Sequence, residues 1–157
     1  ETLFNWLQFD ITGKTVIDPF TGSGSLCLEA LSRGAKSVYS IEKNNTVFKQ
    51  LQSSFKLFPS EKFKLINDDA VAHLSQVSNK SFDLVFLDPP FAKEILPQIL
   101  KLIADNGYIN QTSKIYIESE FQINTDYLRA LDGYHYNIDK QKKSGTVHYC
   151  LISLDKL

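Results

Sequence analysis

The segment Leu84-Val85-Phe86-Leu87-Asp88-Pro89-Pro90-Phe91 joins four apolar residues directly to an acid, two prolines and an aromatic residue. A continuous apolar run bounded by turn residues is typical of a strand buried on both faces. The two prolines exclude helix and ladder hydrogen bonds at its end. The pattern predicts a stiff loop at the carboxyl end of that strand. On it, Asp88, the Pro89 carbonyl and the ring of Phe91 could together hold a planar ring that carries an amino group.

A second loop, Asp18-Pro19-Phe20-Thr21-Gly22-Ser23-Gly24, follows one predicted strand and precedes a predicted helix. Glycines allow the backbone to approach a ligand closely. A dinucleotide-binding loop needs a third glycine three residues further on, and Cys27 stands there. The loop therefore favours a ligand without phosphates, although a tight turn without any ligand is the alternative. The candidate cofactor contacts in it are Asp18, Phe20, Gly22, Ser23 and Gly24.

Carboxylates also end the next two predicted strands. Glu42 can accept hydrogen bonds from both ribose hydroxyls of a nucleoside, or it is a solvated acid at a helix start. Asp69 is the better candidate acceptor for an adenine amino group, with Asp68 as the cap of the next helix. Lys43 and Ala70, their neighbours in sequence, complete the candidate set. These acids suit a neutral to cationic nucleoside, and S-adenosylmethionine carries a positively charged sulfonium.

The elements that must position these loops alternate along the chain. We predict strands at 14–18, 37–41, 63–66, 82–87, 113–119, 134–139 and 146–153, with a polar hairpin loop at 140–145. We predict helices at 1–9, 25–32, 44–57, 70–77, 92–104 and 125–131, with Pro97 marking a kink or the first turn of its helix. Such alternation implies an α/β fold: a doubly wound, mostly parallel seven-stranded sheet with a C-terminal antiparallel hairpin.

Composition narrows the class of protein. The 157 residues fit one domain, which we expect over 1–157, and the contents of 43% hydrophobic and 22% charged residues are ordinary. No apolar run approaches the roughly 20 residues of a membrane span.

Cys27 and Cys150 lie in apolar stretches and are predicted to be buried free thiols, as suits a reducing cytosol. The three histidines lack partners at metal spacing, so no metal is expected, and a net charge of −1 gives little support for nucleic-acid binding.

In their order and spacing, Asp18 to Gly24, Glu42, Asp69 and Asp88 to Phe91 resemble the amino-group class of S-adenosylmethionine-dependent methyltransferases. More narrowly, the chain is similar to the RsmD-like bacterial 16S ribosomal RNA guanine-N2 methyltransferases, and the segments 1–7, 28–35 and 116–120 extend the similarity over nearly the whole chain. The resemblance implies a Rossmann-like fold with S-adenosylmethionine as cofactor. It also implies methyl transfer to guanine 966 of 16S RNA, within a 30S subunit or an assembly intermediate.

The expected roles follow from the target. A guanine amine is a poor nucleophile, and Asp88 and the Pro89 carbonyl can accept its two N–H groups and stabilise the developing charge. Asp88 takes the proton, or the proton passes later to water. Phe91 stacks on a base that has left its RNA helix. The predicted phosphate contacts are Lys93, Lys140, Lys142 and Lys143, although the three hairpin lysines suit a solvated turn nearly as well.

Two further expectations concern the chain as a whole. The family carries a basic segment and an arginine ahead of the residue that matches Glu1, so we expect a short N-terminal segment to be missing. We expect a cytoplasmic monomer. The alternatives are a DNA adenine-N6 or other amine methyltransferase and a catalytically inert S-adenosylmethionine-binding module. No separate target-recognition domain is visible in the sequence, which argues against a sequence-specific DNA methylase.

Overall fold

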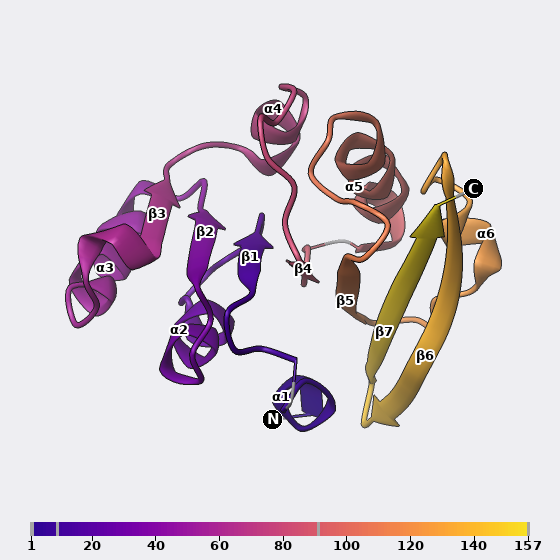
Figure 1. Cartoon of the computed structure of the whole chain (residues 1–157), viewed down its shortest axis with the longest axis horizontal. Coiled ribbons are helices and arrows are strands. Elements are labelled where there is room, and N and C mark those ends of the chain that lie inside the picture. Colours follow the sequence, from indigo (N-terminus) through magenta and orange to yellow (C-terminus); the bar gives the residue numbers. More distant parts are fainter. Residues whose placement is uncertain (1, 9, 91, 157) are drawn as a thin grey trace.

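One seven-stranded sheet organises the chain (Figure 1). The computed structural model describes residues 2–8, 10–90 and 92–156, without the side chains of Thr2, Lys93 and Lys156. The strand order is β3-β2-β1-β4-β5-β7-β6. The strands are β1 (Thr15–Asp18), β2 (Ser37–Ile41), β3 (Phe63–Ile66), β4 (Leu84–Leu87), β5 (Lys114–Ser119), β6 (Tyr134–Ser144) and β7 (Val147–Lys156).

The pairing of the strands confirms the predicted fold class. β3, β2, β1, β4 and β5 pair in parallel, whereas β7 runs antiparallel to both β5 and β6. The order reverses between β1 and β4, because β2 and β3 lie on one side of β1 and the later strands on the other. In open α/β sheets, ligands bind at the carboxyl ends of the strands beside such a reversal.

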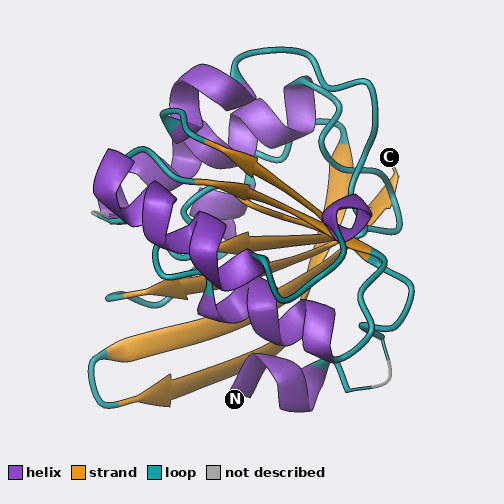
Figure 2. Cartoon of the chain, turned by 90° about the vertical axis from the view of Figure 1, so that its left-hand side faces the viewer, coloured by secondary structure: helices purple, strands orange, loops and turns teal. Residues whose placement is uncertain are grey.

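Helices pack on both faces of the sheet, as Figure 2 shows. They are α1 (Thr2–Trp6), α2 (Ser25–Ser32), α3 (Asn45–Phe55), α4 (Ala70–Leu74), α5 (Ala92–Asp105) and α6 (Thr125–Leu128), with a 3₁₀ turn at Ser60–Lys62. Each face of the sheet has its own apolar core: Val16 and Phe86 belong to one cluster, and their sequence neighbours Ile17 and Val85 to the other. All four residues of β4 are buried, as expected for a strand covered on both faces.

Two helices end earlier than the sequence predicts, and Pro97 lies elsewhere in its helix than one alternative placed it. α4 ends at Leu74 rather than near Val77, because the side chain of Asn106 donates to the Leu74 carbonyl at 2.7 Å and ends the helix there. α6 ends at Leu128, after which a tight turn carries the chain to Leu131. Pro97 lies inside α5 and not in its first turn, so that alternative was wrong.

The C-terminal hairpin is longer than predicted. The segment 140–145, expected to be a polar loop, continues β6 to Ser144, which pairs with Val147, and the chain turns at Gly145 with φ +62°. The polar sequence misled the prediction because β6 is an edge strand whose later residues are exposed. Backbone pairing with β7 holds this segment in the sheet, although its sequence lacks the alternation of apolar and polar residues that is typical of a strand.

Cys27 and Cys150 are both free and buried, which confirms the expectation for the thiols. Across residues 2–8, 10–90 and 92–156, no helix has the length and apolar character needed to cross a membrane.

Candidate functional site

A cavity of about 1130 Å³ opens at the carboxyl ends of β1, β2, β3 and β4. It lies at the reversal of strand order, where the fold favours ligand binding. The strand ends and the start of α5 contribute its lining: Asp18–Ser23, Ser25, Leu26, Ile41–Asn44, Asp68–Ala70, Asp88–Pro90, Glu94, Ile95 and Gln98. The topology thus brings together the candidate acids from four separate strand ends.

The loop after β1 is held by hydrogen bonds from both sides. The Thr21 hydroxyl donates to the carbonyl of Asp18 at 2.9 Å, and the Thr21 amide donates to the carbonyl of Ile41 at the end of β2. The Phe20 amide donates to Asp18 Oδ1 at 3.0 Å. Phe20, Gly22 and Ser23 therefore line the cavity on a backbone that is fixed before any ligand enters.

Gly24 is not among the residues that line the cavity, so its predicted cofactor contact stays a prediction. Its backbone has φ +82°. A Cβ at this position would meet Leu51 Cδ2 at 2.6 Å and Phe55 Cε2 at 3.2 Å. The absence of a side chain lets α3 pack closely against the start of α2.

Glu42 binds two backbone amides with its two carboxylate oxygens. Oε1 accepts from Gly22 at 3.0 Å and Oε2 accepts from Asn44 at 2.8 Å. Each carboxylate oxygen can accept a second hydrogen bond. The side chain is therefore fixed at the cavity with acceptor capacity left for a pair of hydroxyls.

Of the two acids after β3, Asp69 takes the capping role that was expected of Asp68. Asp69 caps α4, since its Oδ2 accepts from the Ala72 amide at 3.0 Å, and Asp68 accepts from the amide of Asp69. The prediction that Asp68 is the cap was wrong, because the helix begins one residue later than that role requires. Both acids line the cavity beside Ala70, and Lys43 Nζ lies 4.0 Å from Asp69 Oδ1.

The loop after β4 closes one side of the cavity. Asp88 and Pro90 are exposed at this point, Pro89 is buried, and all three line the cavity. Phe91 lies outside the described residues, so its predicted stacking role stays a prediction. α5 begins directly after it, at Ala92.

Burial and like charges act together on the acids of this site. Asp18 is only 3% exposed, and burial, followed by the charges of Asp88, Glu118 and Glu42, raises its pKa to about 7 against the opposing hydrogen bond from Phe20. Although Asp88 as a residue is exposed, its carboxyl group is partly enclosed, and this burial, with Glu118 adding to it, raises its pKa to about 6. A cationic ligand would relieve this repulsion and favour the ionised acids.

Glu118 was missed in the sequence. It follows Ile117, the residue of β5 that pairs with Leu87, and Asp88 follows Leu87. The parallel register therefore sets the two acids side by side. The signal was available, because Glu118 stands at a strand end like the acids that were selected.

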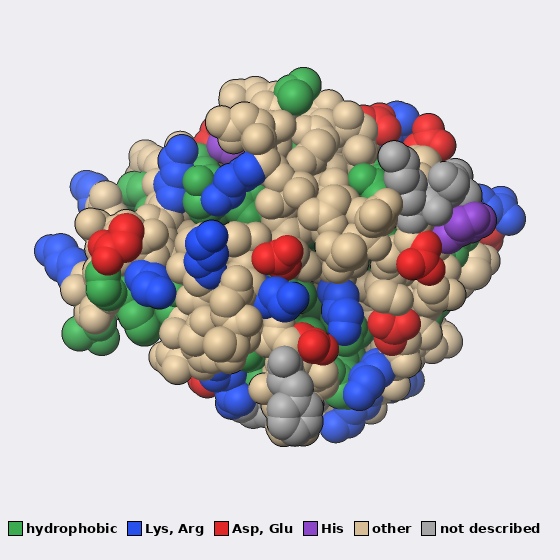
Figure 3. All heavy atoms as spheres, viewed as in Figure 1, with side chains coloured by type: hydrophobic (Ala, Val, Ile, Leu, Met, Phe, Trp, Pro, Cys, Tyr) green, Lys and Arg blue, Asp and Glu red, His purple; other side chains and the backbone are tan. Residues whose placement is uncertain are grey.

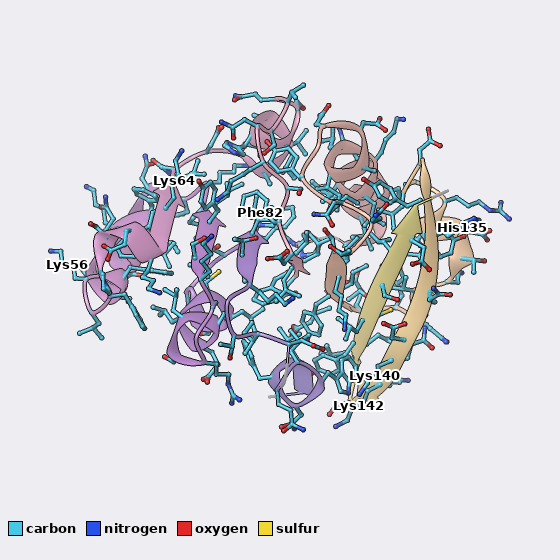
Figure 4. The ribbon with its side chains drawn as sticks, in the orientation of Figure 1. Lys56, Lys64, Phe82, His135, Lys140 and Lys142 are labelled. Atoms are coloured by element: carbon cyan, nitrogen blue, oxygen red, sulfur yellow. The ribbon has the colours of Figure 1, made fainter. Side chains whose placement is uncertain are left out.

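The hairpin lysines lie on β6 rather than on a loop. In Figure 4, Lys140 and Lys142 lie at one end of the hairpin beside α1, with His135 towards the other end of β6. The backbone of Lys142 pairs with Tyr149, which pairs with Glu118, so Lys142 lies two strands, or about 10 Å, across the sheet from the site. Figure 3 shows lysine and arginine side chains spread over the face seen in Figure 1, with acids among them. The side chain of Lys93 lies outside the described part.

Fold and site together define a Rossmann-like methyltransferase. The model of the family described as Conserved hypothetical protein 95 matches residues 1–153. The chain belongs to this family, that of ribosomal RNA small subunit methyltransferase D.

Known proteins match nearly the whole chain in sequence and in structure. The ribosomal RNA small subunit methyltransferase D of Haemophilus influenzae is 37% identical over 154 residues, which cover 96% of this chain and 77% of that protein. Its Escherichia coli counterpart is 34% identical over 151 residues, covering 96% and 74%. Among solved structures, the Escherichia coli protein yhhF superposes with a TM-score of 0.88 at 32% identity, over 99% of this chain and 84% of that one.

Proposed function

We propose that this protein transfers a methyl group from S-adenosylmethionine to the exocyclic N2 amine of guanine 966 in 16S ribosomal RNA. The observation that carries the proposal is the position of Asp88-Pro89-Pro90 on the wall of the cavity, beside the acids that suit the methyl donor. The names of its relatives support a ribosomal RNA of the small subunit as substrate. The guanine and its position rest on the family resemblance.

The residues of the cavity fit S-adenosylmethionine, which when bound supplies an electrophilic methyl group on a positively charged sulfur. Glu42 would accept from both ribose hydroxyls and Asp69 from the adenine amino group, beside Lys43 and Ala70. The loop from Asp18 to Ser23 would surround the remainder of the cofactor, where buried acids favour a cation.

Asp88 and the Pro89 carbonyl would bind the two N–H groups of the guanine amine and turn its lone pair toward the methyl group. Such positioning compensates for a weak nucleophile. Phe91 would stack on the base, and Lys93, Lys140, Lys142 and Lys143 would contact phosphates. We infer that the protein acts as a single cytoplasmic methyltransferase domain, as a monomer, on a 30S subunit or an assembly intermediate.

The test is to incubate the protein with isotopically labelled S-adenosylmethionine and 30S particles from cells that lack this activity, and then to map the labelled base. We expect one label, on the N2 of guanine 966. Label on a different base would contradict the target. Label on DNA adenine alone would favour an adenine-N6 methyltransferase, and cofactor binding without transfer to any substrate would favour an inert binding module.

A further inference from the structure

Glu118 stands next to Asp88 across two neighbouring strands. Parallel pairing sets Leu87 opposite Ile117, and the two acids follow these residues. Neighbouring strands lie about 4.8 Å apart, so side chains on the same face of adjacent strands are in contact. The nearby charge of Glu118 adds to the burial that raises the pKa of Asp88.

The side chain of Glu118 is held in place by Tyr116, two residues earlier on the same strand. The Tyr116 hydroxyl donates to Glu118 Oε1 at 2.6 Å, a length typical of a hydroxyl that donates to a carboxylate. Burial raises the pKa of Tyr116 far above its ordinary value, so the hydroxyl keeps its proton and remains a donor. The Tyr116 ring is 2% exposed and packs edge-on against Phe86 and Trp6, which leaves it little freedom to move.

Other titratable groups face this pair from the neighbouring strands. Asp18 at the end of β1 interacts with both acids of the pair, and Glu42 interacts with Asp18. From β7, Tyr149 lies opposite Glu118 in the register. Glu118 therefore belongs to an acidic group at the sheet edge, and the register of β5 against β4 sets it beside Asp88.

We propose that Glu118 is a positioning residue for methyl transfer, which orients the carboxyl group of Asp88 toward the amine and makes it a stronger proton acceptor. This inference rests on the proposed function of the same site. Burial first, and then the charge of Glu118, raise the pKa of Asp88 to about 6. Asp88 is then ionised at neutral pH but more basic than an ordinary carboxylate.

The transfer step balances with these groups. The amine nitrogen forms a bond to the methyl carbon while the carbon–sulfur bond breaks, so the sulfonium becomes a neutral thioether. The nitrogen then carries one proton too many. Asp88 accepts that proton as a carboxylate and later releases it to water. A more basic Asp88 accepts it earlier along the reaction, which lowers the barrier.

The first test does not require any RNA. Carboxyl-carbon NMR gives the pKa of Asp88 in the unsubstituted protein and in Glu118→Gln, with Asp88→Asn to assign the signal. We expect Glu118→Gln to lower the pKa of Asp88 by about one unit, the size of a close carboxylate's effect. Glu120→Gln is the matched control, since Glu120 is exposed two residues further on, and it should leave the titration in place.

The second test measures single-turnover transfer against pH on whichever amine the protein methylates. In Glu118→Gln we expect the acid limb to move to lower pH with the titration of Asp88. The rate at pH 8 should fall several-fold while cofactor affinity is kept. Tyr116→Phe keeps the ring packing but frees Glu118, and should produce a smaller change in the same direction.

The results separate the two proposals. An Asp88 titration that does not move in either Glu118→Gln or Tyr116→Phe overturns the role of Glu118, whatever the substrate is. A titration that moves without any change in the pH profile of transfer also overturns it. The protein could methylate no guanine and still show, on another amine, the shift of the Asp88 titration and the shift of the pH profile. That result would support the role of Glu118 and exclude guanine as the target.

Discussion

The Gly22 amide donates to Glu42 Oε1 at 3.0 Å, which ties the loop after β1 to the end of β2. One side chain thereby fixes two walls of the cavity. The structure of the cofactor loop and the binding of ribose hydroxyls depend on the same carboxylate.

Glu42→Ala should therefore weaken the binding of S-adenosylmethionine. Hydrogen bonds to a charged group contribute about 1.5–3 kcal/mol, so we expect affinity to fall roughly 10- to 100-fold. Calorimetric titration with the cofactor measures this directly. Glu61→Ala, on the exposed 3₁₀ turn, is the matched control. An unchanged affinity in Glu42→Ala would exclude the ribose role.

Asp88→Ala should remove transfer but not cofactor binding. Loss of a group that stabilises developing charge costs on the order of 100- to 1000-fold in rate, whereas cofactor affinity should stay within a few-fold. Methyl incorporation and calorimetry on the same preparation give the two quantities. Asp132→Ala, at an exposed position, should change neither. Lost cofactor binding with retained activity would show that the assignment of Asp88 is wrong.

Asp18→Asn should change how stability depends on pH. Asp18 has a pKa of about 7 in the fold and an ordinary value of 3.8, so between these values the folded protein holds one proton more than the unfolded chain. The corresponding stability is complete below about pH 4 and is lost as pH rises through about 7. It amounts to roughly 4 kcal/mol at most.

Thermal unfolding from pH 4.5 to 8 measures this effect. The unsubstituted protein should lose melting temperature relative to Asp18→Asn as pH rises, and Asp155→Asn, which is exposed, should follow the unsubstituted protein. Parallel curves for Asp18→Asn and the unsubstituted protein would mean that Asp18 is ionised throughout this range.

Gly24→Ala should destabilise the fold more than Gly22→Ala. Both glycines have positive φ, +82° and +56°, so both substitutions introduce backbone strain. Only at Gly24 would the new Cβ collide, with Leu51 Cδ2 at 2.6 Å, whereas Gly22 has open space around it. We expect a difference of about 1–3 kcal/mol in the free energy of unfolding, measured with denaturant. Equal losses would show that α3 moves aside without cost.

Lys142→Ala should weaken RNA binding uniformly and reduce its dependence on salt. Loss of one phosphate contact lowers the slope of log affinity against log salt by about one. Lys56→Ala is the control, because Lys56 follows α3 at the far side of the molecule from Lys142 in Figure 4. Identical salt slopes for both variants would place the RNA elsewhere.

Sequence alone was enough to predict the sheet and most of the cavity, because apolar runs that end in an acid mark buried strands and their carboxyl ends. Asp18, Glu42 and Asp88 are brought to one edge on that basis alone. The sequence offered Glu118 as an acid near a strand end, but its place beside Asp88 depends on the register of β4 against β5, which no local pattern encodes. The capping role of Asp69 was missed because Asp68 and Asp69 are adjacent acids, and the sequence does not decide which of the two precedes the first helical residue.

The extended β6 has a consequence for the solution behaviour of the protein. It is 11 residues long and lies at the edge of the sheet, where unpaired backbone groups can template a strand from another molecule. Lysines on such an edge oppose that addition, since a second copy would bring its own positive charges into contact. We therefore expect Lys140, Lys142 and Lys143 to help keep the molecules apart, and neutralising all three together should promote aggregation as well as weaken RNA binding.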